Sequence, residues 1–274
     1  MNYSRYTTNF VYSIFGIIFL VSATPALGSL ASTSCNGLLG GDDPIFSSCS
    51  ETNTYTPSGQ TLTQNGNAWA SLSAGQIRAV ASGDRYFSIG YAGTASGLLQ
   101  DVITIQGQGS NWSTNISITM TIDGTVTGPE QNSPNLVANT YLSGFSSSET
   151  SAASTYIRWD GAGFSSDNTG SEGRYSVDVL ASGTNNYSVM LTSTFEVSEL
   201  FPDINFSAYL HATGGSQTTG TVVSDFGSTA QLSIILPAGY SFTSGSGVFL
   251  SAVPDPPPPT SSPVFMPWLP LLLE

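Results

Sequence analysis

The sequence predicts an all-β protein, an antiparallel β-sandwich or jelly-roll-like single domain. Short runs rich in Val, Ile, Thr, Tyr and Phe alternate with clusters of Gly, Asn, Ser and Asp, which signal strands and turns. No helical periodicity appears beyond the N-terminal region. Many short strands at this spacing are typical of sandwiches with antiparallel pairing.

The predicted strands cover residues 69–72, 77–81, 86–91, 102–106, 115–122, 156–159, 174–180, 187–195, 205–211, 220–224, 230–236 and 247–251. In residues 115–122, apolar side chains alternate with Ser and Thr, so one face is apolar and the other carries hydroxyl groups. Asp123 and Gly124 then predict a turn. Residues 163–173 predict an exposed loop, because Ser, Asp, Asn and Gly dominate them.

The N-terminus predicts a secretory signal peptide over residues 1–28. One basic residue, Arg5, precedes the apolar run FVYSIFGIIFLV, and small residues follow at Ala26 and Gly28. A membrane anchor is the alternative, but a spanning helix needs about 20 apolar residues. We expect signal peptidase to cleave after Gly28, or less favourably after Ala23 or Ala26. The protein is then secreted, extracellular or held in the cell envelope.

The remaining chain divides into three parts. Residues 29–66 form a turn-rich segment, residues 67–252 the sandwich domain, and residues 253–274 a Pro-rich linker with an apolar tail. Cys35 and Cys49 lie in the first part and predict a disulfide, because two cysteines in an exported chain meet an oxidising environment. A metal site is the alternative, but no third Cys or His is nearby.

The charge balance excludes several partners. Only 8% of residues are charged, lysine is absent, and the net charge is −13. Such a chain repels phosphate backbones, so we expect no nucleic-acid binding and no basic patch for anionic lipid. Contact with a membrane is expected only during export or through the tail.

No catalytic constellation is evident, so we predict that the protein is not an enzyme. The single histidine, His211, lacks sequence-evident partners, and neither G-x-S-x-G nor H-E-x-x-H occurs. Glycoside hydrolysis needs two acids across a cleft, and the sequence cannot pair its candidate acids. These candidates are Asp160, Asp178, Glu196 and Glu199.

Asp225, Phe226 and Gly227 spell D-F-G without the other kinase motifs. We therefore expect Phe226 to pack inward beside a turn at Gly227, with Asp225 bonding local backbone N–H groups.

We predict no metal site and no cofactor. Calcium is a weaker alternative, because loop oxygens suit it. The loop residues that suggest it are Asp42, Asp43, Asp167, Asn168 and Glu172.

Sugar binding stays open, since aromatic rings stack on pyranose rings while Asn, Asp and Ser bond hydroxyl groups. The candidate sugar-binding residues are Trp112, Trp159 and Trp69, with Trp112 predicted to lie in a loop. Burial in the core is the alternative for each tryptophan.

The C-terminal region resembles that of PEP-CTERM proteins. The shared residues within 222–256 are Asp225, Phe226, Thr229, Ala230, Leu236, Pro237, Gly239, Phe242, Ser244, Ser246 and Gly247. Val253, Pro254, Asp255 and Pro256 then correspond to the Val-Pro-Glu-Pro sorting motif. Asp255 stands in place of Glu, the apolar stretch is short, and the terminal Arg cluster is absent, so the sorting signal is degenerate.

This resemblance implies export in a Gram-negative bacterium and sorting by an exosortase. Members of the family are linked to extracellular polysaccharide and biofilm matrix. The function predicted first is therefore a non-enzymatic matrix component. A carbohydrate-binding module that recognises extracellular polysaccharide is the first alternative, and a secreted hydrolase is the second.

Overall fold

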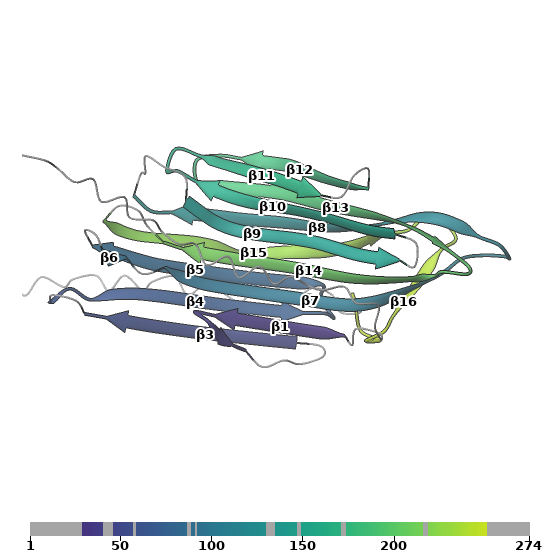
Figure 1. Cartoon of the computed structure of the whole chain (residues 1–274), viewed down its shortest axis with the longest axis horizontal. Coiled ribbons are helices and arrows are strands. Elements are labelled where there is room, and N and C mark those ends of the chain that lie inside the picture. Colours follow the sequence, from purple (N-terminus) through teal and green to yellow (C-terminus); the bar gives the residue numbers. More distant parts are fainter. Residues whose placement is uncertain are drawn as a thin grey trace, which may run out of the picture.

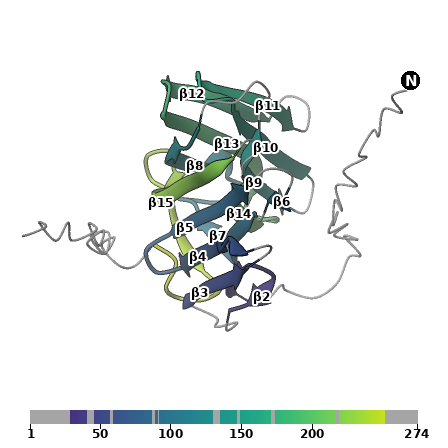
Figure 2. The same cartoon turned by 90° about the vertical axis from the view of Figure 1, so that its left-hand side faces the viewer.

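The protein is a two-layer β-sandwich, as the sequence predicts. The computed structural model describes residues 29–40, 46–56, 59–86, 89–90, 92–129, 135–146, 149–170, 174–215 and 219–250. The predicted signal peptide and the motif at 253–256 lie outside the described residues. Two antiparallel sheets, called sheet I and sheet II here, run along the long axis of the molecule and face each other (Figures 1 and 2).

Sheet I has eight strands. In spatial order it contains β11 (Phe164–Gly170), β10 (Glu149–Trp159), β9 (Asn135–Ser146), β14 (Asp203–Gly214), β7 (Gly93–Gln106), β1 (Leu30–Cys35) and β2 (Leu38–Leu39), with β16 (Ser241–Ser244) also paired to β7. Sheet II has eight strands as well. In spatial order it contains β12 (Tyr175–Ser182), β13 (Asn186–Ser198), β8 (Ser113–Thr127), β15 (Gly220–Ile235), β5 (Gln76–Tyr86), β4 (Leu62–Ser71) and β3 (Phe46–Tyr55), with β6 (Ile89–Gly90) paired to β5.

The strand order places late strands in the middle of both sheets. β14 lies between β9 and β7, and β15 lies between β8 and β5. The chain therefore crosses repeatedly between the layers, and the centre of each sheet is complete only after the C-terminal third is in place. No helix among the described residues is long and apolar enough to cross a membrane.

The core lies between the sheets and follows from the period-two pattern. On β8, the apolar side chains of the predicted alternation are fully buried, from Ile116 to Ile122. On β14, alternate residues from Ile204 to Ala212 are buried in the same way. On β8 the intervening side chains are Ser and Thr and lie on the outer face, so the two-sided pattern predicted for residues 115–122 is confirmed.

The predicted turn at Asp123 and Gly124 is wrong. β8 continues through both residues to Thr127 and pairs with β13 and β15. A Cβ at Gly124 would lie 2.2 Å from the ring of Phe226, so this glycine makes room for a core side chain rather than for a turn.

The predicted roles of Phe226 and Asp225 in the D-F-G sequence are confirmed. Phe226 is fully buried, and Asp225 Oδ1 accepts the backbone N–H of Gly227 at 2.8 Å. The pairing register of β15 shifts just after Phe226, so an irregularity within the strand takes the place of a free turn.

Other strand predictions need correction. β1 and β3 lie in the segment predicted to be turn-rich, and β11 replaces most of the loop predicted at 163–173. No strand was predicted where β9 lies. Each of these strands pairs along its length with a neighbouring strand, which compensates for a weak local pattern. The strand predicted at 247–251 is a turn over its described part, where Gly247 has φ +72° and Phe249 is buried.

The predicted disulfide is confirmed. Cys35 of β1 bonds to Cys49 of β3 with a Cα–Cα distance of 5.9 Å, so the bond joins sheet I to sheet II at one edge of the sandwich. A disulfide of this kind indicates that the protein folds in an oxidising environment outside the cytoplasm.

Candidate functional site

The outer face of sheet II is a surface of hydroxyl and amide groups. Across β13, β8 and β15, outward side chains from neighbouring strands bond to each other. Ser117 Oγ lies 3.0 Å from Thr194 Oγ1. Thr119 Oγ1 bonds to the hydroxyl group of Ser233 in the same way. Cross-strand pairs of this type stabilise a sheet while keeping its surface uncharged.

One part of this face is hollowed into an open groove of about 630 Å³. The groove crosses the first residues of β8, the last outward residues of β13 and the start of β12. Its lining residues are Ser113, Thr114, Asn115, Arg174, Tyr175, Ser176, Thr192, Thr194 and Glu196. We call it the sheet II groove.

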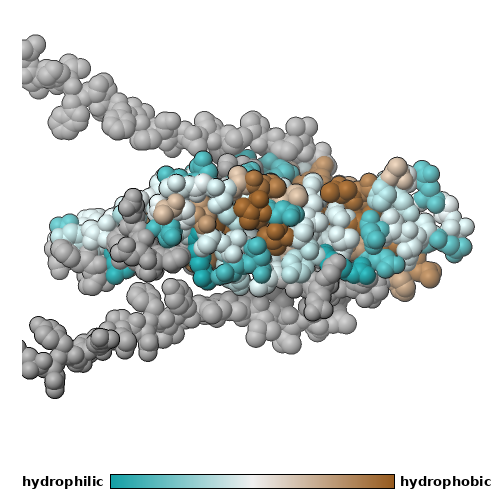
Figure 3. Space-filling view, turned by 90° about the horizontal axis from the view of Figure 1, so that it is seen from above, coloured by the Kyte–Doolittle hydropathy of each residue, from teal (hydrophilic) through white to brown (hydrophobic). Residues whose placement is uncertain are grey.

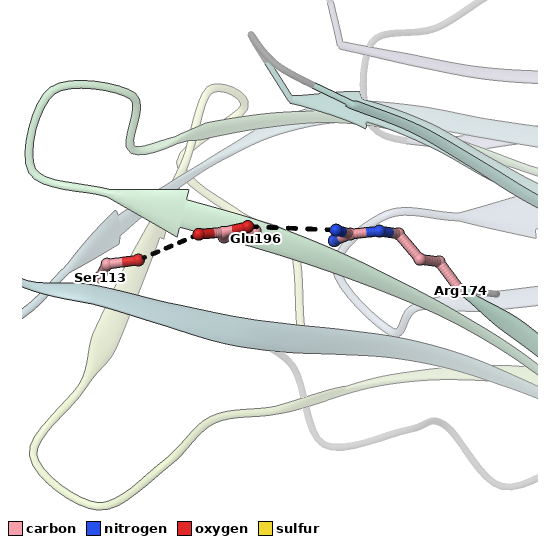
Figure 4. Close-up of polar contacts among 3 residues, drawn as sticks. All are labelled: Ser113, Arg174 and Glu196. Atoms are coloured by element: carbon pink, nitrogen blue, oxygen red, sulfur yellow. Dashed lines mark hydrogen bonds and ion pairs between the residues drawn. The ribbon is translucent and has the colours of Figure 1, made fainter.

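Glu196 and Arg174 are the two charged residues in the lining of the sheet II groove. The Arg174 Nη2 to Glu196 Oε2 distance is 4.0 Å, and Ser113 Oγ donates to Glu196 Oε1 at 3.4 Å (Figure 4). The side chains of Arg174 and Glu196 are 38% and 54% exposed. An ion pair this exposed contributes little to stability, because water screens it.

These groups suit a polyhydroxylated ligand. The groove offers a carboxylate acceptor, a guanidinium donor, the Asn115 amide and several hydroxyl groups that both donate and accept. Tyr175 adds an aromatic side chain that packs partly against the core. Because the groove is open rather than enclosed, it suits a chain that lies along the surface more than a small molecule that needs burial.

The four candidate acids are not brought together. Glu196 lines the groove, and Asp178 accepts a hydrogen bond from Ser176 Oγ on β12. Asp178 pairs with Met190 on β13, six residues from Glu196, which corresponds to about 20 Å along a strand. Glycoside hydrolysis needs a separation below about 10 Å.

The other two acids serve local structure. Asp160 Oδ1 accepts the backbone N–H groups of Ala162 and Gly163, and Glu199 Oε2 accepts that of Asn111.

The three candidate tryptophans lie in different places. Trp159 is 1% exposed, and its indole N–H donates to the Thr184 carbonyl oxygen at 2.8 Å, so its ring offers no face to a sugar. Trp69, on β4, lies beneath the Arg78 guanidinium at 4.8 Å. Trp112, in the loop between β7 and β8, packs edge-on against Tyr240. They form no common row.

His211 lies far from the sheet II groove, on the outer face of sheet I. Its Nε2 is 3.1 Å from Thr213 Oγ1, and its ring stacks on Tyr209. Burial lowers the pKa of His211, because it disfavours the charged imidazolium.

The calcium alternative gains no support from the residues that the structure describes. Asp167 lies 3.3 Å from Arg158 in an exposed ion pair, and the described residues contain no group of three metal-ligating side chains. Asp42, Asp43 and Glu172 lie outside the described residues.

Sequence reasoning named Glu196 but missed the groove around it. The alternation on residues 115–122 predicts a hydroxylated face, yet nothing local predicts that residues 174–176 will lie two strands away from Ser113. That neighbourhood depends on β13 pairing with both β8 and β12.

No protein-family model matches the chain, and no curated protein matches it. Among solved structures, Clostridium perfringens delta-toxin aligns with 10% identity over 79% of this chain and 92% of the toxin, at a TM-score of 0.16. The Clostridium perfringens NetB toxin in its membrane-inserted form aligns with 11% identity over 73% of this chain and 94% of the toxin, at a TM-score of 0.13. Likeness at these TM-scores supports no inference about this chain.

Proposed function

We propose that the protein is an exported, non-enzymatic component of an extracellular matrix or cell envelope, of the PEP-CTERM type. The observation that carries the proposal is the combination of a disulfide-closed sandwich with an outer face rich in hydroxyl groups and an open polar groove. Signal peptidase and an exosortase are its partners during export, and extracellular polysaccharide is its partner afterwards. It acts through its surface and uses no cofactor.

The residues that carry the PEP-CTERM resemblance support the proposal through their structural roles. Asp225 and Phe226 fix the irregular part of β15 against the core. Gly239 and Gly247 have φ values of +87° and +72°, which permit the turns on either side of β16. The shared pattern therefore lies in turns and a strand shortly before the predicted sorting motif, which supports the proposal that a sorting tail follows the domain.

Cell fractionation tests this proposal. The native host is separated into cytoplasm, envelope and medium, and the protein is identified in each fraction by mass spectrometry. We expect it in the envelope or the medium, with the Cys35–Cys49 disulfide formed. Confinement to the cytoplasm contradicts the proposal.

A second candidate function is recognition of a polysaccharide by the sheet II groove. The net charge of −13 disfavours a polyanionic chain. A neutral glycan fits better, because the hydroxyl, amide and carboxylate groups of the groove match sugar hydroxyl groups.

Affinity electrophoresis through a soluble neutral β-glucan and through a polyuronate tests the groove. The double variant Asn115→Ala, Glu196→Gln should lose retention by the neutral polymer. Ser154→Ala is the matched control, because it removes an exposed hydroxyl from the outer face of sheet I. Equal retention of all three proteins contradicts the assignment. Release of new reducing ends from either polymer would contradict the non-enzymatic proposal.

A further inference from the structure

A buried carboxylate lies where the two ends of the described chain meet. Asp101 is on β7 and is only 2% exposed. β1 pairs with residues 95–100 of β7, and β16 pairs with residues 103–106. β14 pairs with residues 93–104 of β7, which overlap both stretches, so β1 and β16 share the other edge of β7. Asp101 therefore sits at the junction between the first and the last strand of sheet I.

Both chain ends donate hydrogen bonds to this carboxylate. Ser29 Oγ donates to Asp101 Oδ1 at 2.8 Å, and the backbone N–H of Ser246 donates to the same oxygen at 3.0 Å. Ser246 Oγ donates to Oδ2, and the N–H of Val102 donates to Oδ1. No arginine pairs with Asp101 among the described residues, and the chain has no lysine. A buried carboxylate without a cation is costly even when it is hydrogen-bonded.

Removal of the predicted signal peptide supplies a cation at this position. Hydrolysis of the bond between Gly28 and Ser29 consumes one water, leaving a carboxylate on Gly28 and an α-amino group on Ser29. That amine is mostly protonated at pH 7. The N and Oγ atoms of one serine are less than about 4 Å apart, so the new ammonium lies within about 7 Å of Asp101 Oδ1.

We propose that Ser29 is the first residue of the processed chain and that its α-ammonium group binds Asp101. Leader removal then completes an ion pair at a site that also holds Ser246, seven residues before the predicted sorting motif. The cleaved N-terminus thereby strengthens the docking of the segment that leads into the tail. This inference rests on the exported part of the proposed function and is independent of polysaccharide binding.

The absence of lysine makes a selective experiment possible, because the processed chain has one primary amine. Mass spectrometry of the protein isolated from envelope or medium should first show Ser29 at the N-terminus. Amine acetylation at pH 7 is then timed on the native protein and in urea. Acetylation requires the neutral amine, so the ion pair should slow it about tenfold in the native state.

Matched variants separate the ion pair from simple burial. Asp101→Asn should restore the fast rate, while Asp203→Asn should not, because Asp203 is an exposed acid elsewhere on sheet I, bonded to Thr104 Oγ1. If Asp101→Asn does not fold, wild type acetylated in urea and refolded replaces it. That protein should melt a few degrees below the unmodified chain.

Three results overturn the proposal. The first is a mature N-terminus other than Ser29. The second is native acetylation as fast as in urea. The third is a melting temperature that acetylation leaves unchanged. Failure of the wider function is distinguishable, since a correctly processed and ion-paired chain that binds no matrix polymer would contradict only the matrix role.

Discussion

The two edges of the sandwich are closed by different interactions. At the edge formed by β1 and β3, a disulfide joins the sheets, and Thr33 Oγ1 bonds to Ser47 Oγ at 2.9 Å beside it. At the edge formed by β10 to β13, aromatic rings fill the space, with Phe164 and Tyr187 centroids 5.2 Å apart. Figure 2 shows these edges at opposite ends of the layers, β3 at one and β12 at the other.

The difference shows how closure depends on what each edge can bury. The β1–β3 edge buries small and hydroxylated side chains, such as Ala31 and Thr33, whose burial contributes little. A covalent bond compensates by restricting the unfolded chain. The β10–β13 edge buries whole aromatic rings, which stabilise it without a covalent bond.

The largest expected effect is at the aromatic edge. Trp159→Ala removes a ring that is 1% exposed and leaves a cavity, so we expect a loss of about 3–5 kcal/mol of unfolding free energy. Urea unfolding measures it. Trp159→Phe is the control, because it keeps a ring while losing the bond to Thr184 O, and it should lose less. A loss below about 1 kcal/mol for Trp159→Ala would show that packing does not close this edge.

Removing the disulfide at the β1–β3 edge should lower the unfolding free energy nearly as much. The double variant Cys35→Ser, Cys49→Ser opens a loop of about 15 residues and should lose roughly 3 kcal/mol. Dithiothreitol should destabilise wild type by a similar amount and leave the double variant unchanged. If amide hydrogen exchange rises at β12 as much as at β1 and β3, the two edges are not independent.

The sequence predicted the covalent edge but not the aromatic one. Two cysteines in an exported chain predict a disulfide directly. For Trp159 the sequence allowed two roles, packing in the core or binding a sugar. Phe164 begins the stretch FSSDNTG, whose composition predicts a loop. It becomes β11 because β10 supplies backbone partners along its whole length.

The centre of the sandwich shows the same limit. Residues 115–122 carry a pattern that depends only on the strand itself, so the sequence predicted them well. The need for glycine at position 124 comes from the ring of Phe226, which is about a hundred residues away in the sequence. The local Asp-Gly pair therefore predicted a turn that does not form. The sheet II groove likewise depends on strand order, which no local pattern specifies.

A smaller effect on the unfolding free energy is expected from the protonation of His211, which lies on β14 between the two edges. Burial lowers the pKa of His211, so the unfolded chain binds a proton more readily than the folded one. The contribution of neutral His211 is complete above pH 6.5 and is lost as the pH falls from there through the lower folded pKa. His211→Gln should flatten this pH dependence in urea unfolding between pH 7 and 5. An unchanged slope would assign the pH dependence to other groups.

The smallest effect is expected on the outside of the aromatic edge. Figure 3 looks onto this side of the molecule and shows hydrophobic side chains at its surface. Val179 and Leu180 of β12 are 47% and 54% exposed. The register of β12 against β13 shifts between Val179 and Ala181, so Leu180 is the extra residue of a bulge.

Leu180→Thr should therefore change the unfolding free energy by less than about 0.5 kcal/mol, because little buried surface is lost. Thermal unfolding at several protein concentrations measures it. A larger loss that grows with concentration would mean that a second copy covers β12 through its outer edge. An unchanged melting temperature, beside the large loss from Trp159→Ala, would show that the rings between the sheets close this edge and that the exposed residues of β12 do not.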